Sequence, residues 1–157
     1  MGKYIRFVCI ICFVIGMTAC QTMPLSEQNT IHPDHQWNSA KPEKYLFNVT
    51  DTNHLYKVIF VIRHHNAYHY KNIWVELKYT AANDKPVTST FNLNLADDQK
   101  GWLGTGMDDI FDQRIPLTIK PIKLKMGINS FSIRHTMRED PLQNILSTGI
   151  RIEKAAL

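Results

Sequence analysis

Hydrophobic and polar residues alternate with a period of two along most of the chain after Pro42. In YKVIFVIRH (residues 56–64), one face carries only large apolar or aromatic side chains, namely Tyr56, Val58, Phe60 and Ile62. The same alternation runs through KYLFNVT (44–50), NIWVELKYT (72–80) and VTSTFNLNLA (87–96). Alternation that is rich in β-branched and aromatic residues is typical of half-buried antiparallel strands. These four stretches are therefore predicted to be strands.

The C-terminal third continues the pattern. PIKLK (121–125) and SFSIRHT (130–136) flank Gly127 and Asn129, which predicts a hairpin with a longer loop, and STGIRIEK (147–154) predicts a last strand. No segment has a sustained 3.6-residue period, and DDIFDQ (108–113) is expected to form one helical turn at most. About seven to eight short strands predict an all-β fold, a single antiparallel β-sandwich of immunoglobulin-like or jelly-roll type.

The N-terminus has the layout of a secretory signal peptide. Lys3 and Arg6 precede an uncharged run over residues 7–19, which is shorter than the roughly 20 apolar residues of a membrane-spanning helix. Its end, MTAC, is similar to a bacterial lipobox, although Met17 stands where leucine is more usual. We therefore expect residues 1–19 to be a lipoprotein signal peptide and Cys20 to carry lipid at the new N-terminus; an uncleaved anchor helix is the alternative.

The segment after Cys20 is polar. Pro24, Pro33 and Pro42 interrupt it, and Trp37 is its one large aromatic residue. This composition predicts a flexible lipidated tether over residues 20–43, with the β-sandwich domain over residues 44–157. We expect Trp37 to mark where the chain first touches the domain.

Cysteine content and charge exclude several classes of function. The three cysteines are Cys9, Cys12 and Cys20, so a processed chain keeps no thiol for a disulfide, a metal or catalysis. Covalent lipid on Cys20 would be its one added group, with no other cofactor, and a bacterial membrane its first partner. Loss of Lys3 and Arg6 lowers the formal net charge of +4 by two. No Lys/Arg cluster remains that would favour a nucleic acid.

The stretch RHHNAYHYKN (63–72) gathers three histidines and raises the question of a metal site. If the strand that begins at Tyr56 continues through His65, then His64 and His65 point to opposite faces and cannot bind one ion. Zinc takes three or four protein ligands, and no cysteine or H-E-x-x-H motif is available. We expect no metal site, and interpret these histidines as the polar mouth of a loop between two strands.

Catalytic patterns are weak. No G-x-S-x-G motif occurs, and no thiol remains after processing. Asp108, Asp109 and Asp112 include a carboxylate pair of the kind that cleaves glycosides, but aspartates in a short polar connection more often cap a turn. The protein is expected not to be an enzyme and to have no catalytic residues.

Two loops carry the remaining candidates. DQKGWLGTGMDDIFD (98–112) holds three glycines beside Trp102, and MREDPL (137–142) holds alternating charges. The simplest interpretation of MREDPL is an internal ion pair of Arg138 with Glu139 or Asp140. If both loops lie at the same end of the sandwich, they would form a partner-docking surface whose candidate residues are Trp102, Asp109, Arg138, Glu139 and Asp140.

Beyond these patterns, the chain resembles a known family. The lipobox, YKVIFVIRH, YHYKNIWVEL, GWLGTGMDDIFD and MREDPLQNILSTGIRIEK are similar to the gliding-motility lipoprotein GldH family of Bacteroidetes. His69 and Asp108 depart from the family, which often has proline and glycine there. The resemblance implies a non-enzymatic envelope lipoprotein associated with gliding and type IX secretion, with machinery proteins as partners. It brings no catalytic residues.

One alternative and the membrane side stay open. A glycan-binding module is the alternative function, because Trp74 and Trp102 would stack on sugars if exposed; burial of both rings would exclude it. Surface-exposed lipoproteins of these bacteria tend to carry acidic residues directly after the lipidated cysteine. QTMPLSEQ (21–28) offers only Glu27, which favours a domain that faces the periplasm.

Overall fold

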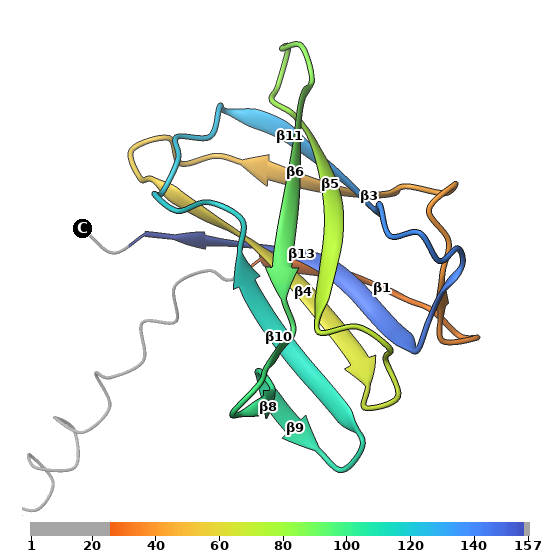
Figure 1. Cartoon of the computed structure of the whole chain (residues 1–157). Helices are drawn as coiled ribbons and strands as arrows, with labels where there is room; N and C mark the ends of the chain where they lie inside the picture. Colours follow the sequence, from red (N-terminus) through yellow and green to blue (C-terminus); the bar gives the residue numbers. More distant parts are fainter. Residues whose placement is uncertain (1–25, 156–157) are drawn as a thin grey trace, which may run out of the picture.

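The computed structural model describes residues 26–155, so the predicted signal peptide and Cys20 lie outside the described residues. All regular structure in residues 26–155 is β-strand, and the strands pair antiparallel. Two sheets make up most of the domain (Figure 1). The predicted all-β antiparallel sandwich is confirmed.

The larger sheet has the strand order β1-β13-β4-β10-β9. Its strands are β1 (Ser26–Ile31), β13 (Ile145–Lys154), β4 (Tyr56–His65), β10 (Ile110–Pro116) and β9 (Thr105–Met107). The second sheet, in the order β3-β11-β5-β6, consists of β3 (Glu43–Val49), β11 (Gly127–His135), β5 (Asn72–Thr80) and β6 (Val87–Asn94). Two small pairs join β2 (Gln36–Trp37) to β12 (Leu142–Gln143) and β7 (Ala96–Asp97) to β8 (Gly101–Trp102).

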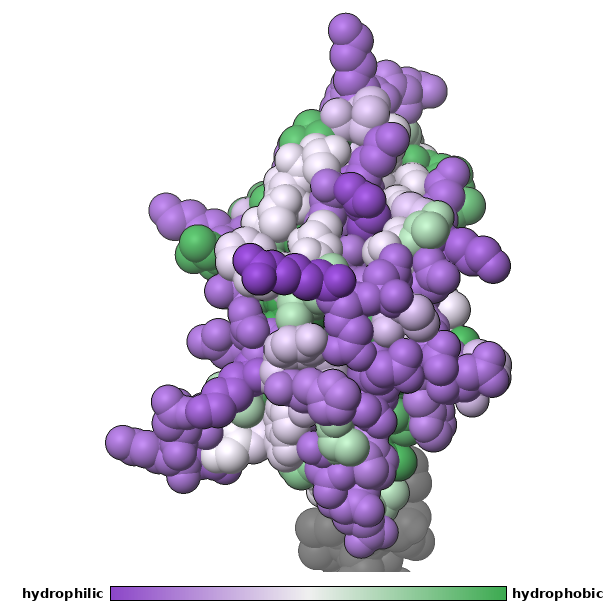
Figure 2. Space-filling view, turned by 45° about the vertical axis from the view of Figure 1, so that its right-hand side comes forward, coloured by the Kyte–Doolittle hydropathy of each residue, from purple (hydrophilic) through white to green (hydrophobic). Residues whose placement is uncertain are grey.

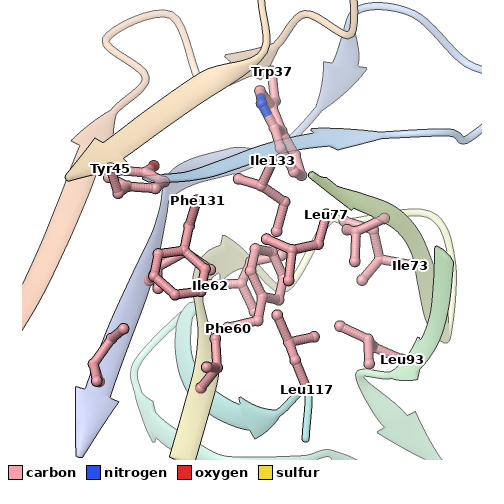
Figure 3. Packing of buried hydrophobic residues seen from close by; sticks show 14 of the residues in the cluster. Trp37, Tyr45, Phe60, Ile62, Ile73, Leu77, Leu93, Leu117, Phe131 and Ile133 are labelled. Atoms are coloured by element: carbon pink, nitrogen blue, oxygen red, sulfur yellow. The ribbon is translucent and has the colours of Figure 1, made fainter. Parts of the chain in front are cut away.

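The core lies between the two sheets and is built from alternate residues of their strands (Figure 3). Phe60 and Ile62 of β4 face Phe131 and Ile133 of β11, and all four side chains are fully or almost fully buried. Trp37 joins them, with 1% of its surface exposed. Because burial of such side chains is the main driving force of folding, the alternation seen in the sequence sets which face of each sheet points inward.

Two sequence-based predictions for the C-terminal half are wrong. Residues 108–113 were expected to form one helical turn at most and no strand, but Ile110–Pro116 is strand β10, paired with β4 and β9. Its pattern was hidden because an inward position is polar: Gln113 is buried and donates from Nε2 to the carbonyl of Leu95 at 2.7 Å. Residues 121–125 form no hairpin with 130–136; β11 pairs instead with β3 and β5.

The prediction of a flexible tether over residues 20–43 is also wrong for residues 26–43, the part of it that the structure describes. Strand β1 pairs with β13 along its whole length, from Ser26 opposite Ile152 to Ile31 opposite Ser147. Trp37 of β2 is buried in the core, but it does not mark the first contact of the chain with the domain, because β1 precedes it. The folded domain therefore includes residues 26–43, because the backbone of β1 pairs with β13 and the Trp37 indole is buried, although most side chains of this segment are polar.

Candidate functional site

Three loops meet at one end of the sandwich, which we call the histidine-tyrosine end: residues 66–71, 95–109 and 136–144. β4 ends at His65 and β5 begins at Asn72, so residues 66–71 connect the two sheets. The Asn66 backbone N–H and side-chain amide both donate to Asp109, at 2.7 and 2.5 Å. On the other side, the Asn144 amide donates to the carbonyl of Ala67 at 3.0 Å. The loop rich in histidine and tyrosine therefore holds the other two loops together. Residues 98–112 and 137–142 thus meet at one end, which is the condition set for a docking surface.

An aromatic cluster closes the core beneath these loops. The His64 ring is fully buried, with its centroid 4.6 Å from that of Trp102, 5.6 Å from Tyr68 and 5.8 Å from Phe111. Aromatic pairs at such distances stabilise a core beyond the area they bury. Trp102 is therefore placed mainly by packing, with part of its ring left exposed.

The histidines of this end have separate roles. His64 points into the core, whereas His65 is partly exposed and lies 3.9 Å from a carboxylate oxygen of Asp109. Burial lowers the pKa of His64, and its Nδ1 lies 3.0 Å from the His65 carbonyl, so this neutral ring donates from Nδ1. In residues 26–155, no group of three or more His, Cys, Asp or Glu side chains converges in a way that could hold a metal ion.

Two acids of the MREDPL segment are held by the fold. Asp140 accepts the backbone N–H of Ser39 at 2.9 Å and its hydroxyl at 2.6 Å, and these bonds lower the pKa of Asp140. Glu139 accepts the Tyr70 hydroxyl at 2.9 Å, which raises the pKa of Tyr70. The two carboxylates thus hold the segment against the turn after β2 and against the loop before β5.

The predicted ion pair of Arg138 with Glu139 or Asp140 is wrong. Arg138 is exposed and forms no ion pair with any residue that the structure describes. The reason is that Ser39 and Tyr70 occupy the two neighbouring acids. The guanidinium stays available at the surface.

Arg138 lines an open groove on the outer side of β5. The groove has a volume of about 440 Å³, and its lining residues are Tyr70, Asn72, Trp74, Thr136, Met137 and Arg138. Trp74 lies on the solvent face of β5 with 43% of its surface exposed, and its backbone N–H points at the Met137 sulfur, 3.3 Å away. Sequence alternation places Trp74 on that face; Tyr70, just before the strand, and Asn72, its first residue, gave no such signal.

The face of the molecule shown in Figure 2 is mostly hydrophilic, with apolar residues scattered over it. The aspartates of the histidine-tyrosine end are tied to neighbours. Asp112 forms an ion pair with Arg63 at 2.6 Å, and Asp98 pairs with Lys71. Asp108 has a left-handed backbone, with φ of 54°, at the turn between β9 and β10. Asp112 and Asp98 are therefore engaged in ion pairs, and Asp108 lies in a turn.

Comparison with known proteins decides the family. Residues 25–152, most of the chain, match the profile of the GldH lipoprotein family. The chain belongs to this family. The match starts next to Ser26, the first residue of β1, which agrees with a domain that includes the segment predicted as tether.

A curated relative is also found. The gliding motility lipoprotein GldH homolog of Christiangramia forsetii is 23% identical over 128 residues, which cover 77% of this chain and 79% of the relative. No solved structure matches. The resemblance recognised in the sequence is confirmed, and membership of a lipoprotein family agrees with the lipid expected on Cys20. No helix in residues 26–155 is long and apolar enough to cross a membrane.

Proposed function

We propose that this protein is an envelope lipoprotein, anchored through Cys20, that supports gliding motility or type IX secretion as a non-enzymatic accessory component. It acts through protein contacts at the histidine-tyrosine end. Family membership and a relative named as a gliding motility lipoprotein homolog support the process. The lipobox supports the anchor.

One observation is the main support for a docking surface at this end. The loops around Trp102 and around Arg138, two residues that are 36 positions apart in sequence, are joined by residues 66–71 into a single end. Asp109 and Arg138 are exposed there, and Arg138 has no ionic partner among the described residues. A surface held rigid by internal hydrogen bonds costs little entropy when a partner binds to it, which favours recognition.

The geometry supports a binding role over a catalytic one. A glycosidase needs two carboxyl groups that flank the scissile bond across a cleft. Asp112 is instead engaged with Arg63, Asp109 with Asn66, and Asp140 with Ser39. Their side chains are committed to the structure of the loops.

The positions of the acidic residues after Cys20 favour a domain that faces the periplasm. Glu27, the one acid that follows Cys20 closely, is part of β1, and its carboxylate lies 3.2 Å from Arg151 and 3.3 Å from Arg114. Residues 21–25 contain no acid. The chain thus lacks the acidic residues that mark surface export, and we propose periplasmic exposure.

The test is depletion of the protein followed by measurement of type IX cargo in the medium and of colony spreading. Loss of both, restored by the wild-type chain but not by Cys20→Ala, would support an anchored part of the machinery. Arg138→Glu should fail to restore them, whereas Lys85→Glu, at an exposed position of the turn between β5 and β6 at the opposite end of β5, should restore them. Normal secretion and spreading after depletion would contradict the proposal.

A second candidate function is glycan binding in the Trp74 groove. Burial of both Trp74 and Trp102 would have excluded this function, but 43% of the surface of Trp74 is exposed. The groove around Trp74 is also lined by polar groups of Tyr70, Asn72 and Arg138. An exposed indole stacks on the apolar face of a sugar, while the amide and guanidinium bind its hydroxyl or carboxylate groups. Titration with soluble envelope glycan fragments tests it: a fluorescence change lost in Trp74→Ala would support binding, and no change in the wild type would contradict it.

A further inference from the structure

The end of the sandwich opposite the histidine-tyrosine end is where the chain from Cys20 enters the domain. We call it the anchor end and define it by Ser26, loops 50–55 and 117–126, and Lys154. Ser26 lies opposite Ile152 in the sheet and shares a cavity of about 200 Å³ with Asp51, Tyr56 and Lys154. Ile122 forms a bridge with Tyr56, so loop 117–126 belongs to the same end (Figure 1).

The start of β1 at Ser26 leaves a short connection to the lipid. Six Cα–Cα steps separate Cys20 from Ser26. At about 3.3–3.6 Å per residue, even a fully extended connection is only about 20 Å long. With lipid on Cys20, the anchor end is therefore the part of the domain that stays next to the bilayer surface.

Loop 117–126 holds apolar and basic side chains out from this end. Leu117 and Leu124 are buried in the core and fix the two ends of the loop. Between and beside them, Ile119 is fully exposed and Met126 is 67% exposed. Lys120 and Lys123 are exposed on the same loop. An exposed apolar side chain flanked by lysines is the composition that binds a membrane interface.

The charges of the anchor end favour an anionic surface. Its acids are paired: Asp51 with Lys154 at 2.7 Å, Asp84 with Lys125 at 2.7 Å, and Glu153 with Arg151 at 2.6 Å. The hydrogen bond from Lys154 lowers the pKa of Asp51 to about 2, so this acid stays charged and paired. Three exposed lysines, Lys57, Lys120 and Lys123, form no ion pair with any residue in 26–155.

We propose that loop 117–126 docks on the bilayer in which Cys20 is anchored, with Ile119 at the interface and Lys120 and Lys123 on the headgroups of anionic phospholipids. This inference rests on the lipid anchor of the proposed function. The docked domain points the histidine-tyrosine end away from the membrane, where a partner reaches it. Lipidation alone limits the distance between the domain and the bilayer. Contact of loop 117–126 with the bilayer fixes the orientation of the domain.

The experiment uses lipidated protein in vesicles of phosphatidylethanolamine and phosphatidylglycerol. Cys20 is the one cysteine of the processed chain and is blocked by lipid, so Ile119→Cys can be labelled alone with an environment-sensitive fluorophore. Met107→Cys, with Met107 78% exposed at the turn between β9 and β10, is the matched control. Nitroxide-labelled lipid should quench the probe at 119 and leave the probe at 107 unchanged. Equal quenching at both positions, or at neither, would overturn the proposal.

Charge variants test the headgroup contact. Each lysine near an anionic surface contributes an attraction that corresponds to about a fivefold change in equilibrium. Lys120→Gln and Lys123→Gln should each lower the equilibrium constant for docking, obtained from the docked and undocked fractions of the 119 probe, by about that factor. Lys100→Gln, at the other end, should leave it unchanged. Quenching that persists in both lysine variants and in neutral phosphatidylcholine vesicles would contradict recognition of anionic lipid.

Flotation of the same vesicles distinguishes a failure of the Cys20 lipid anchor from a failure of loop 117–126 to dock. Protein that fails to float with them would contradict the Cys20 anchor. Protein that floats while the 119 probe stays in water would contradict the docking alone.

Discussion

Asn29 of β1 lies directly opposite Gly149 of β13, and the Asn29 side chain occupies the space that a Cβ of residue 149 would take. A Cβ there would also overlap the carbonyl oxygen of Gln28, which is backbone and cannot swing aside. The absence of a side chain at Gly149 therefore allows β1 to pack against β13.

Gly149→Ala is therefore expected to detach β1. Overlap with backbone in a packed region costs about 1–3 kcal/mol, so the free energy of unfolding should fall by that amount. Urea unfolding measures the loss, and hydrogen exchange should show that protection disappears over Ser26–Ile31 first. Ser147→Ala, two residues away in β13 and already bearing a Cβ, is the control and should keep β1 protected. Unchanged exchange in β1 of Gly149→Ala would show that the strand tolerates the overlap.

Gly104 and Gly101 form a second matched pair, in the loop that carries Trp102. Both have positive φ, 90° and 72°. A Cβ on Gly104 would overlap the carbonyl oxygen of Asp112 and the Gln113 side chain, whereas a Cβ on Gly101 would meet nothing. Gly101→Ala should cost about 1–2 kcal/mol from backbone strain alone. Gly104→Ala should cost about 1–3 kcal/mol more. Equal losses in urea unfolding would show that the loop moves away from β10 without penalty.

The buried His64 should make stability depend on pH. Its pKa is lowered by burial, so below the ordinary value of 6.5 the unfolded chain takes up a proton that the folded chain does not. The contribution of His64 to the free energy of unfolding is therefore fully present above pH 6.5, and it is lost as the pH falls below that value. His32 and His135 are also buried with lowered pKa, and they contribute with the same sign.

His64→Phe tests this contribution, because phenylalanine fills the same aromatic site and carries no titrating group. Unfolding free energies measured at pH 7.5 and at pH 5 should differ less in the variant than in the wild type. The residual dependence belongs in part to His32 and His135. An undiminished difference in the variant would assign the whole effect to other groups.

The sequence predicted β4 and β5 well because their side chains carry the fold. β5 alternates apolar with polar residues and buries its apolar face, whereas β4 is apolar and buried on both faces from Val58 to Ile62. β1 could not be found in this way, since SEQNTI has one large apolar residue, Ile31, and it is 75% exposed. What holds β1 is long-range: its backbone pairs with β13, and the Gln28 amide exchanges hydrogen bonds with the Leu46 backbone at 2.7 and 3.1 Å.

The candidate site was predictable to a similar degree. Alternation placed Trp74 on the solvent face, and turn composition marked the loops around Trp102 and Arg138. The partners of Glu139 and Asp140 were not predictable, because Tyr70 and Ser39 are 69 and 101 residues away. Local sequence favoured an ion pair within MREDPL, and tertiary contacts replaced it.

The two partly exposed tryptophans provide the last prediction, because the structure assigns them different roles. Trp102 packs against the buried His64 ring at 4.6 Å, so Trp102→Ala should leave a cavity at the end of the core and cost about 3 kcal/mol. Trp74 lies in the open groove beside Arg138, so Trp74→Ala should cost less than about 1 kcal/mol. Urea unfolding of both variants measures the difference. If Trp74→Ala is the more destabilising, its indole is part of the packing and the case for a ligand in the groove is lost. If Trp74→Ala keeps its stability but fails to restore secretion and spreading after depletion of the protein, the groove itself is required for function.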